Sequence, residues 1–487
     1  METDKVPSST TNAAPLVLSS LPNQNPNLTA GGSDDSSSAP KRISATAPKR
    51  FVKSHIPESI LSDPSINAAA ALLPSNYDFE VHKTVHRIAS SGTRRPALQL
   101  PDGLLMYALP IADILQSAAD TRLDEVLILA DPTYGACCLD DFAASALSAD
   151  LLVHYGHSCL VPVPTSRLPV LYVFVDIRVD TDRLVQAVRS AFPSSSKLAL
   201  AGTIQFVAAV HSARSLLSAD GYDITVPQAK PLSPGEVLGC TAPTIPRSKG
   251  IDAVVFVADG RFHLEAFMIA NPEIPAFRYD PFLGVLVLEK YDHEGMKRAR
   301  KDAILAAREA KRWGIILGTL GRQGNTRVLD RVLDHMEEKG LESTTVLMSE
   351  ISPARIALFG DSIDAWVQIA CPRLSIDWGE GFTKPLLTTF ELDIALGYVP
   401  GWWEKEQVRV SVNAEPNTCK EESCSCSRNC EPKLSDCNCK SDAHTGYPMD
   451  YYAQDGGDWN SSYVKKKPPS SGIRLQRRIG RQSGVKT

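Results

Sequence analysis

The sequence has 487 residues, 43% of them hydrophobic and 22% charged, and its 51 Lys and Arg against 56 Asp and Glu give a net charge of −5. This balance argues against a strongly basic protein that binds nucleic acid. No apolar run reaches the about 18 residues that a membrane span needs, and no N-terminal apolar region suggests a secretory signal. We therefore expect a cytoplasmic protein of roughly three domains, whose eleven cysteines stay reduced and serve metal or catalytic roles before disulfides.

Both ends of the chain are polar. Residues 1–50 are rich in Ser, Thr, Asn, Ala and Pro and are predicted to form a disordered arm. Residues 404–487 are predicted to be a polar tail with a basic end, which is either a solvated tail or a nuclear-import or polyanion-binding patch. Within the tail, residues 419–439 hold six cysteines with no Cys-x2-Cys pair, so we interpret this stretch as a disordered insert, with soft-metal binding as the alternative.

Between the ends, short apolar runs rich in β-branched residues alternate with helical stretches. Continuous apolar runs are typical of strands buried on both faces of a parallel sheet, and alternation with helices indicates βαβ units. The predicted strands are Ala97–Leu100, Glu125–Ala130, Val170–Ile177, Leu198–Thr203, Ala253–Ala258, Gly314–Thr319, Thr344–Met348 and Trp366–Ala370.

The pattern predicts an α/β protein of three similar modules with parallel sheets around a central site. We expect a first domain over residues 51–190, a second over 191–305 and a third over 306–403. No tight sequence repeat is visible, but each domain carries a cysteine after a strand-like run or a turn, and these are Cys137, Cys240 and Cys371.

Asp102 and Gly103 follow the first predicted strand and open a helix whose apolar stripe runs from Leu104 to Leu115. Pro110 should kink or shorten that helix. Open α/β folds place polar ligand groups at such strand ends, so Asp102 and Gly103 are candidates for binding a cofactor or substrate. An Asp at the positive end of a helix is an equally good explanation.

The three cysteines would lie beyond the carboxyl ends of strands, where α/β folds bind ligands. Thiolates are the usual ligands of iron–sulfur clusters, and three of them on a four-iron cluster leave one iron open to a substrate. A buried cysteine that merely packs is the alternative at each position. Because adjacent side chains diverge, we favour Cys137 over Cys138 as the ligand of the first domain.

Two further patterns are weaker. His154, His157 and Cys159 could bind zinc, but a fourth ligand at familiar spacing is missing. Gly318–Gly324 follows a predicted strand and precedes a helix, so its backbone could hold an anion, but it lacks a full phosphate-loop motif. A structural turn explains it equally well.

Several of these stretches occur, in order, in a known family. From residue 50 to 403 the chain resembles the diphthamide-synthesis family, in its eukaryotic subunit 1 form, and the Cys-rich stretch 419–439 departs from the pattern as an insertion. The matching stretches are Leu72–Glu80, Leu100–Met106, Thr133–Phe142, Val153–Pro162, Tyr279–Pro281, Leu317–Gly324, Cys371–Gly379 and Tyr447–Tyr452.

The resemblance implies a transferase that moves a 3-amino-3-carboxypropyl group from S-adenosylmethionine to the imidazole C2 of a histidine in elongation factor 2, the first step of diphthamide biosynthesis. It implies a radical mechanism at a [4Fe-4S] cluster held by Cys137, Cys240 and Cys371. The catalytic side chains stay unassigned.

The resemblance also implies partners: a paralogous subunit 2 in a heterodimer, elongation factor 2 as the protein substrate, and a small electron-donor protein. It implies neither a nucleic acid nor a membrane. Two other functions remain open, a non-catalytic cluster-bearing scaffold subunit of the same complex and a zinc-stabilised binding module.

Overall fold

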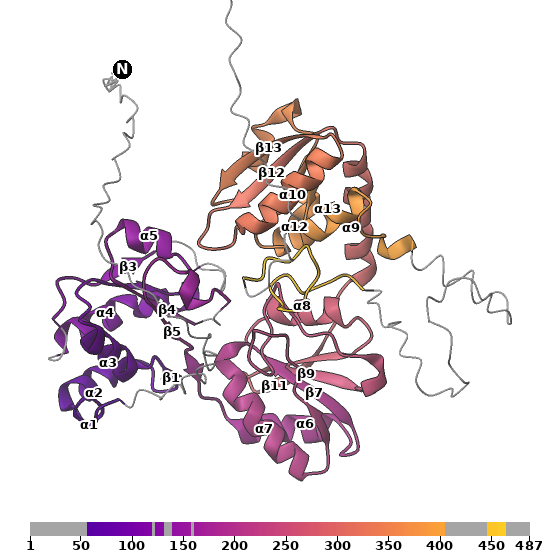
Figure 1. The fold of residues 1–487 in the computed structure, drawn as a ribbon. Helices are drawn as coiled ribbons and strands as arrows, with labels where there is room; N and C mark the ends of the chain where they lie inside the picture. Colours follow the sequence, from indigo (N-terminus) through magenta and orange to yellow (C-terminus); the bar gives the residue numbers. More distant parts are fainter. Residues whose placement is uncertain (1–55, 119–121, 131–138, 157–159, 405–445, 464–487) are drawn as a thin grey trace, which may run out of the picture. The chain divides into compact units, whose positions relative to one another are not determined.

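The structure is a computed structural model, and it describes residues 56–118, 122–130, 139–156, 160–404 and 446–463. All of these residues belong to one compact unit that begins at His55 (Figure 1). The predicted arm over residues 1–50, Cys137, Cys138, Cys159 and the Cys-rich stretch 419–439 lie outside the described residues.

The first sheet is parallel and has the strand order β3-β2-β4-β5. Its residues are buried in two separate cores, with Leu98 and Val153 in one core and Ala97 and Leu152 in the other, as strands covered on both faces require. Its elements are α1 (Glu58–Leu61), α2 (Pro64–Ala70), α3 (Val81–Ser91), β2 (Pro96–Gln99), the 3-10 helix η1 (Asp102–Tyr107), α4 (Ala108–Ser117), β3 (Leu127–Leu129), α5 (Asp141–Ala146), β4 (Leu151–Tyr155), η3 (Val163–Thr165) and β5 (Val170–Val173).

The helix predicted from Leu104 to Leu115 is divided. A 3-10 helix ends at Tyr107, and the α-helix begins at Ala108, so Pro110 occupies its first turn, where a missing N–H removes no internal hydrogen bond. The predicted strand over residues 170–177 is also divided, because β6 (Asp176–Ile177) leaves the first sheet to pair antiparallel with β1 (Tyr77–Asp78).

The second sheet has the order β11-β10-β9-β7-β8. It is parallel except for β11, which pairs antiparallel with β10 through a hairpin that the sequence analysis did not expect. Its elements are α6 (Thr181–Ala191), β7 (Lys197–Gly202), η4 (Ile204–Phe206), α7 (Val207–Ala219), β8 (Asp223–Thr225), η5 (Arg247–Lys249), β9 (Ala253–Val257), α8 (Phe262–Ala270), β10 (Ala276–Asp280) and β11 (Val285–Glu289).

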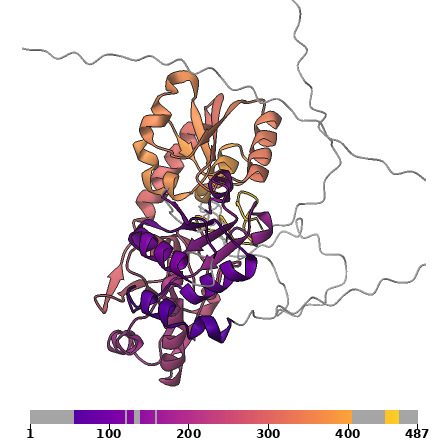
Figure 2. The same cartoon turned by 90° about the vertical axis from the view of Figure 1, so that its left-hand side faces the viewer.

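The third sheet is parallel with the order β13-β12-β14-β15, and helices cover both of its faces (Figure 2). Its elements are α9 (His293–Arg308), β12 (Arg312–Gly318), α10 (Thr326–Glu338), β13 (Glu342–Met348), α11 (Pro353–Ala357), η6 (Gly360–Ser362), β14 (Ala365–Ile369), α12 (Arg373–Trp378), η7 (Gly379–Gly381), β15 (Leu386–Leu387) and α13 (Thr389–Ala395). The expected α/β class with several parallel sheets is confirmed.

The three sheets repeat one topology. In each, the first strand in sequence has the second strand on one side and the third on the other, and the fourth strand lies beyond the third. The chain therefore reverses its winding direction between the first and third strands, which is the switch point where open α/β sheets bind ligands beyond the carboxyl ends of the strands.

The repeat has a side-chain signature at the amino ends of the sheets. An aspartate directly before each third strand accepts hydrogen bonds from backbone N–H groups at the start of the first strand. These contacts are Asp150 with Arg94 (2.7 Å), Asp252 with Lys197 (2.8 Å) and Asp364 with Arg312 (2.9 Å). A proline precedes each fourth strand, and its carbonyl accepts from the third strand at Pro169, Pro275 and Pro385. These positions satisfy backbone groups that the strand ends would otherwise leave unpaired.

Two helices lie in one predicted domain but pack with the next. All but the last residue of α6 falls within residues 51–190, yet the helix packs on α7 and β11 of the second sheet, with Leu184 and Val188 in that core. α9 falls largely within residues 191–305, yet it packs on α13 and β15 of the third sheet. Each module therefore begins with the helix that precedes its first strand, as α3 does in the first module.

Residues 446–463 differ from the expected polar tail, because the structure places this segment, yellow in Figure 1, in the protein core. Tyr447, Met449, Tyr451 and Tyr452 are buried in a cluster that also contains core residues of the second and third modules. We call residues 446–463 the C-terminal segment. Its buried aromatic side chains supply apolar area that helps to offset the entropy of ordering the segment.

No helix in the described part of the chain combines the length and the apolar character that crossing a membrane requires.

Candidate functional site

Two of the three predicted cysteine ligands lie within the described residues. Cys371 directly follows β14 and precedes α12, and Cys240 lies in the long loop after β8. That loop is held at the carboxyl end of β7, because Gly202 pairs with Glu236 and exchanges backbone hydrogen bonds with Gly235 and Val237. Both thiols therefore lie at the strand ends where the sequence analysis expected them.

Cys240 is at the tip of a tight turn. Leu238 and Thr241 exchange backbone hydrogen bonds of 2.9 and 3.2 Å, which leaves Gly239 and Cys240 as the two central residues. A Cβ atom on Gly239 would overlap the ring of Phe262, so the aromatic ring packs directly on the backbone of the turn. Only glycine lets the turn approach α8 this closely, and the approach fixes the position of the thiol.

The loops of the two cysteines are joined, because Arg373 beside Cys371 donates to the Phe262 carbonyl and the Phe262 ring packs on the Cys240 turn. Burial first, and then the charge of the Cys371 thiolate, raise the pKa of the Cys240 thiol to about 12. Neither residue is part of a disulfide. Without a metal, a thiol in this position keeps its proton. Coordination to a metal ion would displace that proton.

A buried guanidinium lies beside the cysteines. Arg373, two residues after Cys371, is 3% exposed, and its charge lowers the pKa of Cys240 against the larger effect of burial. Arg373 donates to the carbonyl of Phe262 (2.6 Å) and to Glu265 (2.6 Å), and its guanidinium stacks over the Phe262 ring. It thus connects the Cys371 loop to the helix that supports the Cys240 turn. It also pairs with Asp377 (2.8 Å), so two carboxylates share its positive charge.

This donor set fits an iron–sulfur cluster. The buried Cys240 thiol and the half-buried Cys371 thiol come from different modules, their loops are joined through Arg373 and Phe262, and soft thiolates are the ligands that such clusters take. The sequence analysis missed Arg373. The signal was its place two residues after a candidate ligand, at the start of a helix that needs no arginine there.

Glu236 is a second residue that the sequence analysis missed. Its side chain is fully buried four residues before Cys240, with Oε2 accepting from the Ser233 N–H (3.0 Å) and Oε1 without a hydrogen-bond partner. Burial raises the pKa of this carboxyl from 4.5 to about 7, partly opposed by the Ser233 hydrogen bond. A carboxyl with this pKa can hold or release a proton near neutral pH.

The Glu236 carboxyl should make the folded protein less stable as the pH rises from about 4.5 to about 7. In that pH range the carboxyl of the unfolded chain ionises while that of the folded protein keeps its proton. The unfolded state therefore binds fewer protons, and the free energy of unfolding falls by at most about 3 kcal/mol. Glu236→Gln should abolish this loss. Urea unfolding at about pH 5 and about pH 8 measures it.

The matched control is Glu337→Gln, an exposed carboxylate on α10. It should change the free energy of unfolding equally at both pH values. If Glu236→Gln and Glu337→Gln show the same pH dependence as the wild type, the carboxyl of Glu236 is not perturbed by burial.

Asp102 and Gly103 are exposed at the start of η1, directly beyond β2. This is the switch point of the first sheet, since β4 neighbours β2 there. The loops after these two strands touch, because a Cβ atom on Gly156 would lie 3.0 Å from Pro101. The position agrees with ligand binding at a switch point.

The glycine-rich turn over residues 318–324 makes its contacts with other parts of the protein. Arg322 in this turn makes a bidentate ion pair with the buried Asp141 of α5 (2.5 and 2.6 Å) and donates to the Thr165 carbonyl (3.1 Å). Gly324 packs so closely on the Gly318 carbonyl that a Cβ atom would overlap it. These contacts favour the structural turn over the anion-binding loop.

His154 belongs to the core. It is fully buried in β4, its Nδ1 hydrogen bonds with Gln99 Oε1 (2.9 Å), and its ring packs edge to face on Tyr172. The other two members of the candidate zinc set, His157 and Cys159, lie outside the described residues. Among the residues that the structure places, no group of three or more His, Cys, Asp and Glu is arranged to hold a metal ion.

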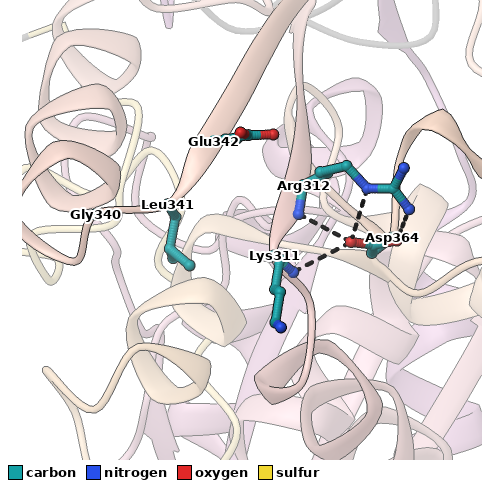
Figure 3. A pocket seen from close by; sticks show the side chains of 6 residues that line it. All are labelled: Lys311, Arg312, Gly340, Leu341, Glu342 and Asp364. Atoms are coloured by element: carbon teal, nitrogen blue, oxygen red, sulfur yellow. Dashed lines mark hydrogen bonds and ion pairs between the residues drawn. The ribbon is translucent and has the colours of Figure 1, made fainter.

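A hollow of about 530 Å³ lies at the amino ends of the strands of the third sheet, opposite the carboxyl ends where Cys371 lies (Figure 3). Its polar wall is the ion pair between Arg312 and Asp364 (2.6 Å), and the hydrogen bond from Arg312 is the main reason that the pKa of Asp364 is lowered. Asp364 also accepts from the backbone of Lys311 and Arg312. Because this aspartate belongs to the structural repeat, we do not assign the hollow to ligand binding. It is lined by Lys311, Arg312, Gly340, Leu341, Glu342 and Asp364.

The fold and the cysteine geometry define a class of protein, an α/β chain of repeated flavodoxin-like modules that brings thiols from separate modules together at its strand ends. The family model described as "Putative diphthamide synthesis protein" matches residues 100–408. The chain belongs to this diphthamide-synthesis family, which confirms the resemblance found in the sequence.

Curated relatives agree over most of the chain. The human protein is 53% identical over 352 residues, covering 72% of this chain and 79% of the relative. The chicken protein is 46% identical over 422 residues (85% and 91%), and the Schizosaccharomyces pombe protein is 48% identical over 384 residues (78% and 87%). All three are named 2-(3-amino-3-carboxypropyl)histidine synthase subunit 1, so the family includes transferases and the expected enzyme class is confirmed.

The fold has solved counterparts. Two crystal structures of Dph2 from Pyrococcus horikoshii, one of them with a 4Fe-4S cluster, match with TM-scores of 0.55 and 0.56 at 24% identity. They cover 66% of this chain and 91% and 92% of their own. At this identity the likeness establishes the shared fold.

Proposed function

We propose that this protein transfers a 3-amino-3-carboxypropyl group from S-adenosylmethionine to the imidazole C2 of a histidine in elongation factor 2. The reaction is the first step of diphthamide biosynthesis and proceeds by a radical mechanism at a [4Fe-4S] cluster. Cys137, Cys240 and Cys371 are the proposed ligands, one from each of the three domains expected from the sequence. The names of the relatives and the 4Fe-4S cluster of one solved Dph2 support this proposal.

The convergence of Cys240 and Cys371 is the observation that carries the proposal. These residues are 131 positions apart in the sequence, come from different modules and are not joined in a disulfide, yet Arg373 beside Cys371 donates to Phe262, whose ring packs on the Cys240 turn. Packing alone does not require two thiols to meet in this way, whereas a shared metal cluster does.

The bound cluster would supply the electron that breaks the Cγ–S bond of S-adenosylmethionine. The protein's own residues would fix the site around it. The Gly239 turn and the Phe262 ring hold one thiol, β14 and Pro372 hold the other, and Arg373 offsets part of the negative charge. Burial of Cys240 excludes water from its side of the site.

The proposal includes the partners that the family implies. The name "subunit 1" of the relatives supports a complex, which we propose is a heterodimer with a paralogous subunit 2. A small electron-donor protein would supply the reducing electron. The setting is the cytoplasm, where elongation factor 2 acts and cysteines stay reduced.

The decisive experiment is anaerobic co-expression with subunit 2, followed by three measurements on the purified complex. Iron and sulfide analysis tests the cluster, single-turnover formation of methylthioadenosine tests the cleavage, and mass spectrometry of elongation factor 2 tests the transfer. All three should be positive. A cluster without methylthioadenosine would indicate a scaffold subunit, and zinc in place of iron would indicate a binding module.

Asp102 and Gly103 are the proposed contacts to S-adenosylmethionine or the substrate histidine. A Cβ atom on Gly103 would meet no heavy atom within 4 Å, so Gly103→Ala should leave the thermal unfolding temperature and the iron content unchanged. If a ligand approaches this backbone closely, the added methyl group should reduce kcat/KM by roughly tenfold or more, the usual consequence of misplacing a reactant. Steady-state kinetics measures the effect.

Gly446→Ala is the matched control, since a Cβ atom there also meets open space. Its kcat/KM should equal that of the wild type. Full activity in both variants would remove Gly103 from the binding site.

A further inference from the structure

The Cys240 turn is bound by the C-terminal segment, which reaches it from more than 200 residues away in the sequence. The Tyr451 N–H donates to the carbonyl of Cys240 itself (3.2 Å), and the Ala242 N–H donates to the Met449 carbonyl (2.8 Å). Thr241 pairs antiparallel with Asp450. The segment therefore completes a small sheet with the turn and restrains the backbone on both sides of the thiol.

Thr241 connects this restraint to the sulfur. Its side chain is fully buried, and its hydroxyl accepts a hydrogen bond from the Tyr452 N–H (3.1 Å). The same hydroxyl is 3.7 Å from Cys240 Sγ, in donor geometry. A hydroxyl has one hydrogen, and because the Tyr452 N–H occupies a lone pair of the oxygen, that hydrogen is free to point at the sulfur.

We propose that Thr241 is a positioning residue that tunes the reduction potential of the cluster by donating a hydrogen bond to the Cys240 thiolate. The inference rests on the proposed function, in that it requires a cluster bound by Cys240. Hydrogen bonds to ligating sulfurs are among the features that set cluster potentials. The C-terminal segment is part of the device, because the Tyr452 N–H orients the hydroxyl.

The direction of the effect follows from charge. One electron from a reductant converts the oxidised cluster to its one-electron-reduced form and makes the ligating sulfurs more negative. A donor hydrogen bond to a more negative acceptor is stronger, so Thr241 stabilises the reduced form more than the oxidised form. Loss of the hydroxyl should make the cluster harder to reduce.

The test is a redox titration of the anaerobically purified complex with dithionite, followed by the visible absorption and the electron paramagnetic resonance signal of the cluster. Thr241→Val keeps the shape of the side chain and removes the donor. It should shift the midpoint potential to a more negative value, with a roughly three- to tenfold smaller equilibrium constant for reduction, tenfold being about 59 mV for one electron. Thr241→Ser keeps the hydroxyl and should restore most of the wild-type potential.

The matched control is Thr389→Val. The Thr389 hydroxyl donates to the Trp459 carbonyl (2.7 Å), so this variant also removes a hydrogen bond that holds the C-terminal segment, but one that does not reach Cys240. Its potential should equal that of the wild type. If Thr241→Val does not fold, the comparison of Thr241→Ala with Thr241→Ser replaces it.

Each outcome is decisive. An unchanged potential in a cluster-loaded Thr241→Val would overturn the inference, and so would an equal shift in Thr389→Val, because the effect would then come from loosening the segment. A wild-type complex without a cluster would overturn the proposed function instead. Since the readout is a potential and a spectrum, loss of turnover by another route does not imitate the result.

Discussion

Replacing either Cys240 or Cys371 by alanine should remove the cluster from the purified complex. Each residue supplies one thiolate, and no other cysteine among the residues that the structure describes can take its place. Loss of a partner that only supports a ligand already costs about 10- to 100-fold in metal affinity, so loss of the ligand itself should cost more than about 100-fold. Iron and sulfide content per chain and the visible charge-transfer absorption of the cluster measure the effect.

The variants have a matched control in the Cys-rich stretch. Cys424→Ala removes a thiol that is outside the proposed ligand set, and it should leave the iron content unchanged. Circular dichroism should show the same helix content in all three variants, which separates loss of the cluster from loss of the fold. Wild-type iron content in both Cys240→Ala and Cys371→Ala would refute the three-cysteine assignment.

The largest effect on stability is expected at the ion pair between Arg300 of α9 and Glu391 of α13. Both side chains are buried, at 2% and 0% exposure, and the guanidinium makes two bonds to the carboxylate, of 2.7 and 2.8 Å. Burial lowers the pKa of the Arg300 guanidinium, but the Glu391 carboxylate has a larger opposite effect, so the pKa is raised overall. Glu391 also accepts from the Tyr447 hydroxyl (2.8 Å), which anchors the C-terminal segment.

Removing one partner leaves the other charge buried and unpaired. Arg300→Met and Glu391→Leu should therefore each lower the free energy of unfolding by about 3 to 5 kcal/mol. The double variant should be more stable than the sum of the two losses predicts, because no buried charge remains. Urea unfolding followed by tryptophan fluorescence is suited to the measurement, since Trp313 and Trp366 are fully buried in the third module.

The exposed ion pair between Arg355 and Glu350 is the control, with 54% and 66% of the two side chains exposed at a similar separation of 2.9 Å. Its single variants should change the free energy of unfolding by no more than about 0.5 kcal/mol. Equal losses at the two pairs would mean that burial does not govern their strength.

Much of the fold could be predicted from the sequence because strands buried on both faces have a distinctive composition. All eight predicted apolar runs contain strands, such as β7 where Leu198–Thr203 was expected and β14 where Trp366–Ala370 was expected. The sequence analysis predicted no strand at β4, β10 or β11. Val285–Glu289 is an antiparallel edge strand with exposed apolar residues, and nothing in its spacing indicates a hairpin partner.

The repeated strand order shows more clearly what cannot be predicted from a single sequence. The three modules share one strand order, but at the amino ends of their sheets the described signature is a single aspartate and a single proline in each module, at positions such as Asp252 and Pro275. These residues pair backbone groups at strand ends. Two residues in about one hundred do not rise above chance in a single sequence.

By itself the sequence determined the eight most apolar strand-forming runs, the α/β class and the candidate thiols, because burial on both faces of a sheet and turn-flanked cysteines leave local patterns. Only the tertiary structure decided which helix covers which sheet, that residues 446–463 enter the core, and that Cys240 and Cys371 share a site with Arg373. The last two features depend on contacts between residues more than 100 positions apart. Such contacts leave no period or spacing in the chain, because they arise from shape and charge complementarity that exists only after the modules have formed.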